Sequence, residues 1–144
     1  MGDQLTKHDQ QLHMIIGCGR LGAGVASMFS SNGIDVVTID ISKDAFGRLP
    51  SSYTGFTIEA DACDVRALEN AEIRKVGTML VATGDDNINI MVSQIAKIIY
   101  EVPIVVTRLY DTEKEILLKD SGIGVIYPVK LEFEAFRKIL GIND

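Results

Sequence analysis

Short apolar runs alternate with amphipathic stretches from residue 12 onward. The runs are rich in β-branched residues and are bounded by glycine, proline or polar residues, as is typical of strands buried on both faces of a parallel sheet. Six such runs are present, Leu12–Ile16, Val36–Ile39, Phe56–Ile58, Met79–Ala82, Ile104–Val106 and Val125–Ile126. The pattern therefore predicts six short strands.

The stretches between the runs repeat apolar residues at the spacing of amphipathic helices. Capping residues and glycine or proline stops suggest their ends. The expected helices run from about Leu21 to Ser31, from Ser42 to Leu49, from Asp64 through Ile73, from Asp86 to Ile99, from a capping box at Thr112 to Leu118, and from Leu131 to Leu140. Repeated βα units predict a Rossmann-like doubly wound α/β fold, a six-stranded parallel sheet with helices on both faces.

The last helix has no strand after it. Its apolar face must pack on its own sheet, on a partner subunit, or on something beyond the end of this chain. The rest of the sequence shows no break in composition, so we expect a flexible lead-in over residues 1–11 and a single domain over residues 12–144.

Charge, cysteine content, apolar run length and histidine spacing argue against several classes of partner and site. The formal net charge of -6 argues against nucleic acid as the main partner. Cys18 and Cys63 form no CxxC pair and are typical of reduced thiols in a cytosolic protein. There is no apolar run long enough to span a membrane, so we expect no direct membrane insertion. His8 and His13 lie at no metal-ligand spacing from the cysteines, and we expect no metal site.

The strongest motif is a G-x-G-x-x-G between the first strand and the first helix. In such a loop the first glycine allows the tight turn, the second lets a pyrophosphate approach the backbone, and the third allows close packing of helix on strand. The free amides at the helix N-terminus favour phosphate charge. The motif is made by Gly17, Cys18, Gly19, Arg20, Leu21 and Gly22. A plain strand–helix turn without a ligand is the alternative.

Two charged residues, Asp40 and Arg20, bear on which ligand this motif would bind. Asp40 ends the second strand, where an acid accepts hydrogen bonds from ribose hydroxyls and repels a 2′-phosphate. NAD(H), ADP, ATP and AMP are therefore compatible ligands, and NADP is disfavoured. The alternative is an acid that only caps the next helix. Arg20 can reach a terminal phosphate on its own subunit or a neighbour's, or it can be a surface arginine.

With these features the sequence resembles the RCK, or KTN, domain, the nucleotide-binding regulator of Trk- and Ktr-type potassium uptake systems and of some potassium channels. Four further segments carry the resemblance: Ile58–Asp64, Val81–Asn87, Val106–Asp111 and Gly122–Pro128. Two features depart from the family. Val129 stands where many members have glutamate, and the usual smaller C-terminal domain is absent, by truncation or by nature.

The resemblance implies further ligand contacts. It places Asp61 and Ala62 beside the adenine, and it places Ile41, Thr83, Gly84, Asp85 and Arg108 at the border of the nucleotide. For Arg108, a structural ion pair with a neighbouring acid is the alternative to a ligand contact.

The resemblance also implies partners. The last helix would cross to a second subunit and form a homodimer, and such dimers would assemble into a ring under a membrane-embedded potassium transporter or channel. This location is cytoplasmic, at the inner face of the membrane. The expected function is a nucleotide-sensing regulatory subunit that gates ion flux. We expect no enzyme and no catalytic residue, because no second domain supplies a substrate site. The alternatives are the cofactor domain of an NAD-dependent dehydrogenase and a subunit with a permanently bound, structural nucleotide.

Overall fold

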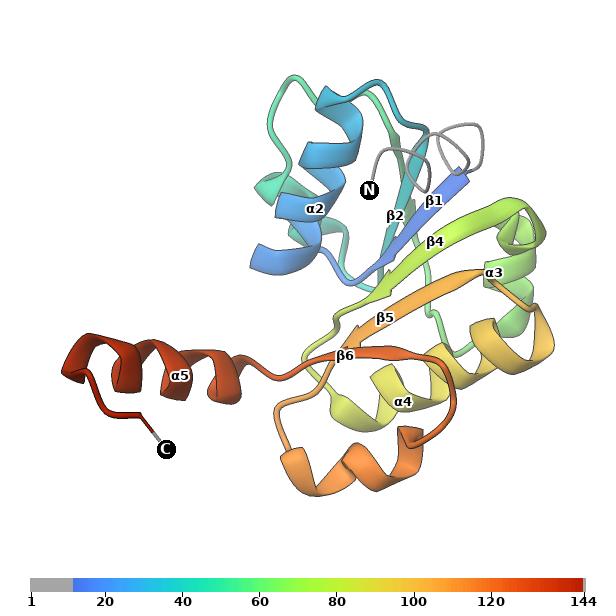
Figure 1. Cartoon of the computed structure of the whole chain (residues 1–144). Helices are drawn as coiled ribbons and strands as arrows, with labels where there is room; N and C mark the ends of the chain where they lie inside the picture. The colour runs from blue at the N-terminus through green and yellow to red at the C-terminus, as the bar shows by residue number, and fades with distance from the viewer. Residues whose placement is uncertain (1–11, 144) are drawn as a thin grey trace.

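The computed structural model describes residues 12–143, so the lead-in expected over residues 1–11 lies outside the described residues. Its centre is a six-stranded sheet in the order β3-β2-β1-β4-β5-β6, and every neighbouring pair is parallel (Figure 1). The strands are β1 (Leu12–Ile16), β2 (Val36–Asp40), β3 (Phe56–Glu59), β4 (Val76–Val81), β5 (Ile104–Arg108) and β6 (Gly124–Ile126). This confirms the predicted doubly wound fold.

Helices cover both faces of this sheet. The α-helices are α2 (Arg20–Ser31), α3 (Val65–Asn70), α4 (Asp86–Gln94) and α5 (Pro128–Leu140). Shorter segments are the 3-10 helices η1 (Lys43–Arg48), η2 (Ile73–Lys75) and η4 (Thr112–Leu118), and the π-helical turn η3 (Ile95–Ile99). In Figure 1, α2 lies on one face, and α3 and α4 lie on the other.

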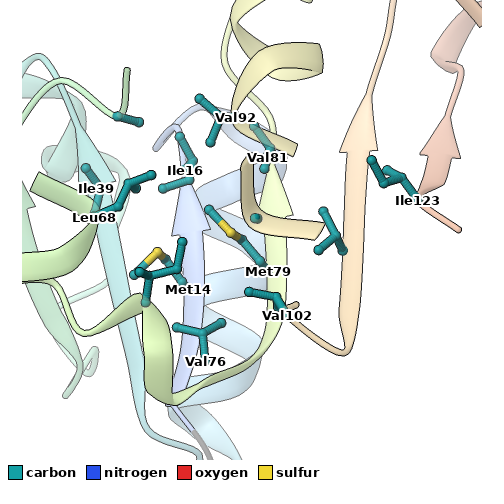
Figure 2. Packing of buried hydrophobic residues seen from close by; sticks show 14 of the residues in the cluster. Met14, Ile16, Ile39, Leu68, Val76, Met79, Val81, Val92, Val102 and Ile123 are labelled. Atoms are coloured by element: carbon teal, nitrogen blue, oxygen red, sulfur yellow. The ribbon is translucent and has the colours of Figure 1, made fainter. Parts of the chain in front are cut away.

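The side chains of β1 alternate between the two faces of the sheet and contribute to a separate hydrophobic core on each face. Met14 and Ile16 pack with residues of α3 and α4 in the larger cluster, which Figure 2 shows around Met79. Ile15 points the other way and packs against Phe29 of α2. Successive side chains of a strand point to opposite faces, so one apolar run supplies both cores. Both cores hold β1 in place, and β1 leads directly into the glycine loop.

Helix α4 starts at Asp86 as predicted, whereas the cap of η4 is shifted by one residue from the predicted position. Asp85 caps α4: its extended backbone lets the carboxylate accept from the amides of Asn87 at 2.8 Å and Ile88 at 3.2 Å. Asp111, and not Thr112, caps η4 and accepts from the amide of Glu113. Thr112 is already inside η4, so it cannot turn back to cap it.

Other boundaries also differ from the sequence pattern. Asp64 caps α3 as predicted, but the helix ends at Asn70 because Glu72 adopts a left-handed backbone with φ of 66°. Ser42 precedes η1 without a side-chain cap bond to any described residue. The long helix after Asp86 changes from α to π geometry at Ile95.

Helix α5 extends away from the sheet (Figure 1). None of its residues is buried among the described part of the chain. Its large apolar side chains are at least half exposed, and they are Val129, Leu131, Phe133, Phe136, Ile139 and Leu140. Of the three locations open to this apolar face, packing on its own sheet is therefore not the one observed. Among the described residues, no helix is both long and apolar enough to cross a membrane.

Candidate nucleotide-binding site

A cavity of about 480 Å³ opens at the carboxyl ends of the parallel strands. The loops that follow β1, β2, β3 and β4 contribute to its wall, together with Arg108 at the end of β5. β1 has β2 on one side and β4 on the other, so strand order reverses there. Open α/β sheets bind ligands in the crevice at this point, and the volume lies in the range of small-molecule sites.

The glycine loop is built as a phosphate-binding turn requires. Gly17 has φ of 95°, and a Cβ on it would lie 2.5 Å from the carbonyl oxygen of Ala82. A Cβ on Gly22 would lie 1.8 Å from the carbonyl oxygen of Gly17. Gly19, by contrast, would meet no described atom within 4 Å. The first and third glycines therefore fit turn and helix together, and the second leaves open space at the N-terminus of α2.

Asp40 is fixed at the wall of the cavity. One carboxylate oxygen accepts from the amide of Cys18 at 2.8 Å, and the other accepts from the amide of Ser42 at 2.8 Å. The second bond fixes the residue that precedes η1, but Asp40 is not the cap of that helix, whose N-cap residue is Ser42. Each oxygen keeps a further lone pair, so the carboxylate can still accept from a ribose hydroxyl. Burial, and next the charge of Asp40, raises the pKa of the Cys18 thiol, which leaves it protonated at neutral pH.

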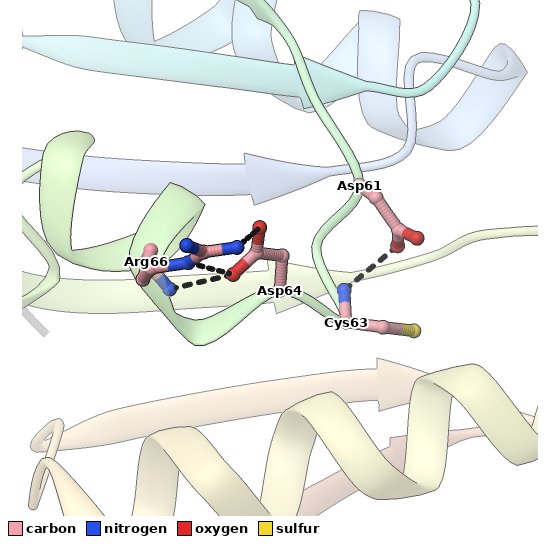
Figure 3. A network of polar contacts seen from close by, with 4 residues as sticks. All are labelled: Asp61, Cys63, Asp64 and Arg66. Carbon is pink, nitrogen blue, oxygen red and sulfur yellow. Dashed lines mark hydrogen bonds and ion pairs between the residues drawn. The ribbon is translucent and has the colours of Figure 1, made fainter.

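The loop after β3 brings a second acid to the cavity. Asp61 and Ala62 both line it. Figure 3 shows that Asp61 accepts from the amide of Cys63, while Asp64 accepts from Arg66 outside the cavity. Ala62 is 8% exposed, so it offers a small apolar surface beside the acid. A flat apolar ring with polar edges suits this combination.

A buried asparagine organises the loop after β4. Asn89 of α4 is fully buried, and its amide oxygen accepts from both the amide and the hydroxyl of Thr83, at 2.9 and 2.6 Å. Its amide nitrogen donates to the carbonyl oxygens of Thr83 and Arg108, at 3.1 and 2.9 Å. One side chain therefore joins the carboxyl ends of β4 and β5. The sequence analysis missed it, because only the fold reveals where an asparagine inside a helix points.

Arg108 faces carbonyl groups. Its Nη2 donates to the carbonyl oxygens of Ala82 and Thr83, at 3.4 and 3.2 Å, and its guanidinium lies 5.0 Å from the ring centre of Tyr110. Among the described residues it has no acidic partner within ion-pair distance, and its buried Nε has no hydrogen-bond partner. The ion-pair alternative is therefore not what the described residues form.

Most residues predicted from sequence meet at this cavity. Its lining includes Gly17, Cys18, Gly19, Asp40, Ile41, Asp61, Ala62, Thr83, Gly84, Asp85 and Arg108. Three predicted residues lie outside it: Leu21 packs in the smaller core, Gly22 packs against the turn, and Arg20 is exposed. Sequence reasoning missed Arg48, which lines the wall eight positions after Asp40. A cation shortly after the acid was the available signal.

A larger cavity of about 680 Å³ lies elsewhere, between η4 and the end of β6. It contains no part of the glycine loop and none of the predicted ligand residues. The smaller cavity is the candidate nucleotide site, because the glycine loop, the acid and the switch point coincide there. Within residues 12–143, no three histidine, cysteine or acidic side chains gather as metal ligands.

Comparison with known sequences gives a family match over most of the chain. The TrkA-N domain model matches residues 13–128. The chain is 33% identical over 107 residues to the Trk system potassium uptake protein TrkA homolog of Pyrococcus horikoshii, which covers 74% of this chain and 47% of that protein. It is 30% identical over 120 residues to TrkA of Streptomyces coelicolor, covering 83% and 54%. The chain thus spans about half the length of these relatives.

Solved structures share the fold. The GsuK channel bound to NAD has a TM-score of 0.77 and 22% identity, with 92% of this chain and 24% of that chain covered. GsuK bound to ADP has a TM-score of 0.76 and 23% identity, with 96% and 36% covered. The Kef CTD of Shewanella denitrificans in its AMP-bound form has a TM-score of 0.69 and 21% identity, with 92% and 83% covered.

Proposed function

Because this chain belongs to the TrkA-N domain family, we propose that it is a nucleotide-binding regulatory module of a potassium uptake system or channel, and not an enzyme. The observation that carries the proposal is the switch-point cavity, where an open glycine loop and a fixed carboxylate share one wall. Relatives named as Trk potassium uptake proteins support the potassium link. Structures with NAD, ADP and AMP support the ligand class.

Each side of the cavity then takes one part of the ligand. The phosphates lie at the α2 N-terminus over Gly19, where backbone amides and the helix dipole stabilise their charge. The ribose hydroxyls donate to Asp40, and the adenine lies beside Asp61 and Ala62. Ile41 and the segment Thr83–Asp85 border the nucleoside. NAD(H), ADP, ATP or AMP fit this scheme, and NADP binds more weakly because its 2′-phosphate meets Asp40.

Two arginines take different roles in this scheme. Arg108 offers its unpartnered Nε side to a ligand that enters the cavity. Arg20 is exposed outside the lining, so it reaches a terminal phosphate from the edge of the loop or from a neighbouring subunit. A guanidinium can bind phosphate oxygens in bidentate geometry in either position.

Assembly through α5 would let nucleotide binding change the relative orientation of the subunits. Its exposed apolar face would be buried in a homodimer, and further contacts would build a ring below the membrane-embedded subunit, on the cytoplasmic side. A ligand shifts such an assembly only if it binds one relative orientation of the subunits more tightly than another. Ligands that differ in phosphate number or carry nicotinamide make different contacts across the cavity, which supplies that difference.

The test is a calorimetric titration of NAD, NADH, NADP, ADP, ATP and AMP into protein first cleared of co-purified nucleotide. We expect reversible binding of at least one adenine nucleotide, with NADP weaker than NAD. Asp40→Ala should weaken binding severalfold, whereas Asp35→Ala, an exposed acid just before the other end of β2, should not change it. A folded, nucleotide-free sample that binds none of these ligands contradicts the proposal. A ligand that neither dialyses away nor exchanges supports a structural nucleotide instead of a sensor.

A further inference from the structure

Arg48 is a cation on the wall of the cavity that the scheme above leaves unused. It ends η1 and lines the cavity together with Ile41 and Ala45 of the same region. Its Nη1 donates to the carbonyl oxygen of Cys18 at 3.5 Å, which is a long and weak contact. The side chain is otherwise exposed. Most of the five donors of this guanidinium are therefore open to a ligand.

Asp40 also contacts Cys18, at the amide nitrogen and not at the carbonyl oxygen that Arg48 contacts. The amide of Cys18 donates to Asp40 at 2.8 Å, while its carbonyl oxygen receives Arg48. A carboxylate and a guanidinium thus approach a single residue of the glycine loop from its two sides. The carboxylate is fixed by a second short bond from Ser42, but the guanidinium is held by one weak contact and can turn.

Asp40 and Arg48 are two residue types that Rossmann sites use for opposite ligand preferences. An acid at the end of the second strand selects a ribose 2′-hydroxyl, and a nearby arginine accommodates a 2′-phosphate. On the premise that the cavity binds an adenine nucleotide, we propose that Asp40 and Arg48 act against each other at the 2′ position of the ribose. Asp40 favours the hydroxyl and sets the preference for NAD over NADP. Arg48 attracts a 2′-phosphate and limits that preference.

The consequence is a latent site for 2′-phosphorylated nucleotides. Removing the charge of Asp40 removes the repulsion and leaves Arg48 as a free phosphate ligand. Removing Arg48 leaves the repulsion unopposed. The ligands that test this directly are AMP and adenosine 2′,5′-bisphosphate, because they differ by the 2′-phosphate alone. The measured quantity is the ratio of their two dissociation constants.

We expect wild type to bind AMP more tightly than the bisphosphate. Asp40→Asn should shift the ratio about tenfold toward the bisphosphate, and Arg48→Gln should shift it about tenfold the other way, as expected for one charged hydrogen bond. In the double variant Asp40→Asn/Arg48→Gln the gain from Asp40→Asn should be lost. Lys43→Gln is the matched control, since Lys43 is an exposed cation on η1 outside the cavity lining, and the ratio should stay unchanged.

Melting temperatures of all variants show whether each is folded, and AMP affinity reports the rest of the site. If Arg48→Gln weakens AMP and the bisphosphate equally, Arg48 contacts the adenine or the 5′-phosphate and the opposition at the 2′ position is wrong. If the double variant keeps the full tenfold shift that Asp40→Asn shows relative to wild type, the role of Arg48 is likewise wrong. If wild type binds neither ligand nor any nucleotide of the panel, the proposed function fails together with this inference.

Discussion

Gly22→Ala tests whether the glycine loop has the close packing described above. The new Cβ would lie 1.8 Å from the carbonyl oxygen of Gly17 and 3.3 Å from Cγ2 of Ile15. Gly17 cannot move away from the new methyl group. Its Cα faces the carbonyl of Ala82, and its amide donates to the carbonyl oxygen of Ile39 at 2.8 Å. The helix must therefore move away from β1, along which the smaller core is packed.

Such overpacking against a backbone carbonyl costs about 2–3 kcal/mol of unfolding free energy. For a domain of this size that corresponds to a melting temperature roughly 6–10 °C lower. Gly24→Ala is the matched control in the same helix, since its Cβ would meet no described atom within 4 Å. An exposed glycine replaced by alanine inside a helix stabilises by about 0.5–1 kcal/mol.

The assay is urea and thermal unfolding of wild type and both variants, followed by circular dichroism. Opposite signs for the two glycines are the expected result. If Gly22→Ala unfolds within about 0.5 kcal/mol of wild type, the range of a neutral surface change, the close contact with Gly17 is wrong. Gly19→Ala adds the functional counterpart: it should leave stability unchanged and weaken nucleotide binding about tenfold, because its Cβ enters the space assigned to the phosphates.

Three further predictions concern other parts of the molecule. Asn89→Ala leaves groups of Thr83 and Arg108 without partners and should lower the unfolding free energy in urea by about 2–3 kcal/mol; a loss near zero would mean that water replaces the amide. Burial raises the pKa of the Cys18 thiol, so the contribution of the protonated thiol to stability is complete at neutral pH and is lost as the pH rises through that raised pKa; wild type should therefore lose stability with alkaline pH more steeply than Cys18→Ala, and parallel curves would contradict this. Phe133→Glu/Phe136→Glu should convert a dimer to a monomer in light scattering, while Lys138→Gln should not; a wild-type monomer would refute the dimer.

The fold was predictable from the sequence because its signals are local. β-branched runs of about five residues cannot satisfy their backbone hydrogen bonds as isolated helical turns. Their alternation with amphipathic segments then requires a parallel sheet. The glycine loop was predictable for the same reason: its three glycines and the following helix lie within one continuous segment, Gly17–Ser31. Asp40 followed from a fixed spacing to that loop.

The remaining features depend on contacts between distant segments. Capping by Asp85 left Asp86 free to accept from the amides of Tyr110 and Asp111, at 3.0 and 2.8 Å, and no local pattern distinguishes two adjacent acids. Asn89 joins two strand ends that are far apart in sequence. Arg48 reaches Cys18 only because η1 folds as a 3-10 helix back toward the glycine loop.

The most direct test of the central claim is an NMR titration of isotopically labelled protein with AMP and with NAD, observed at the backbone amides. We predict that the largest shifts fall on Gly17–Gly22, on Asp40 and Ile41, on Asp61 and Ala62, and on Thr83–Asp85. Amides around η4 and β6, beside the larger cavity, should remain unchanged. Shifts confined to η4 and β6, or no shifts at millimolar ligand, would contradict a nucleotide site at the glycine loop.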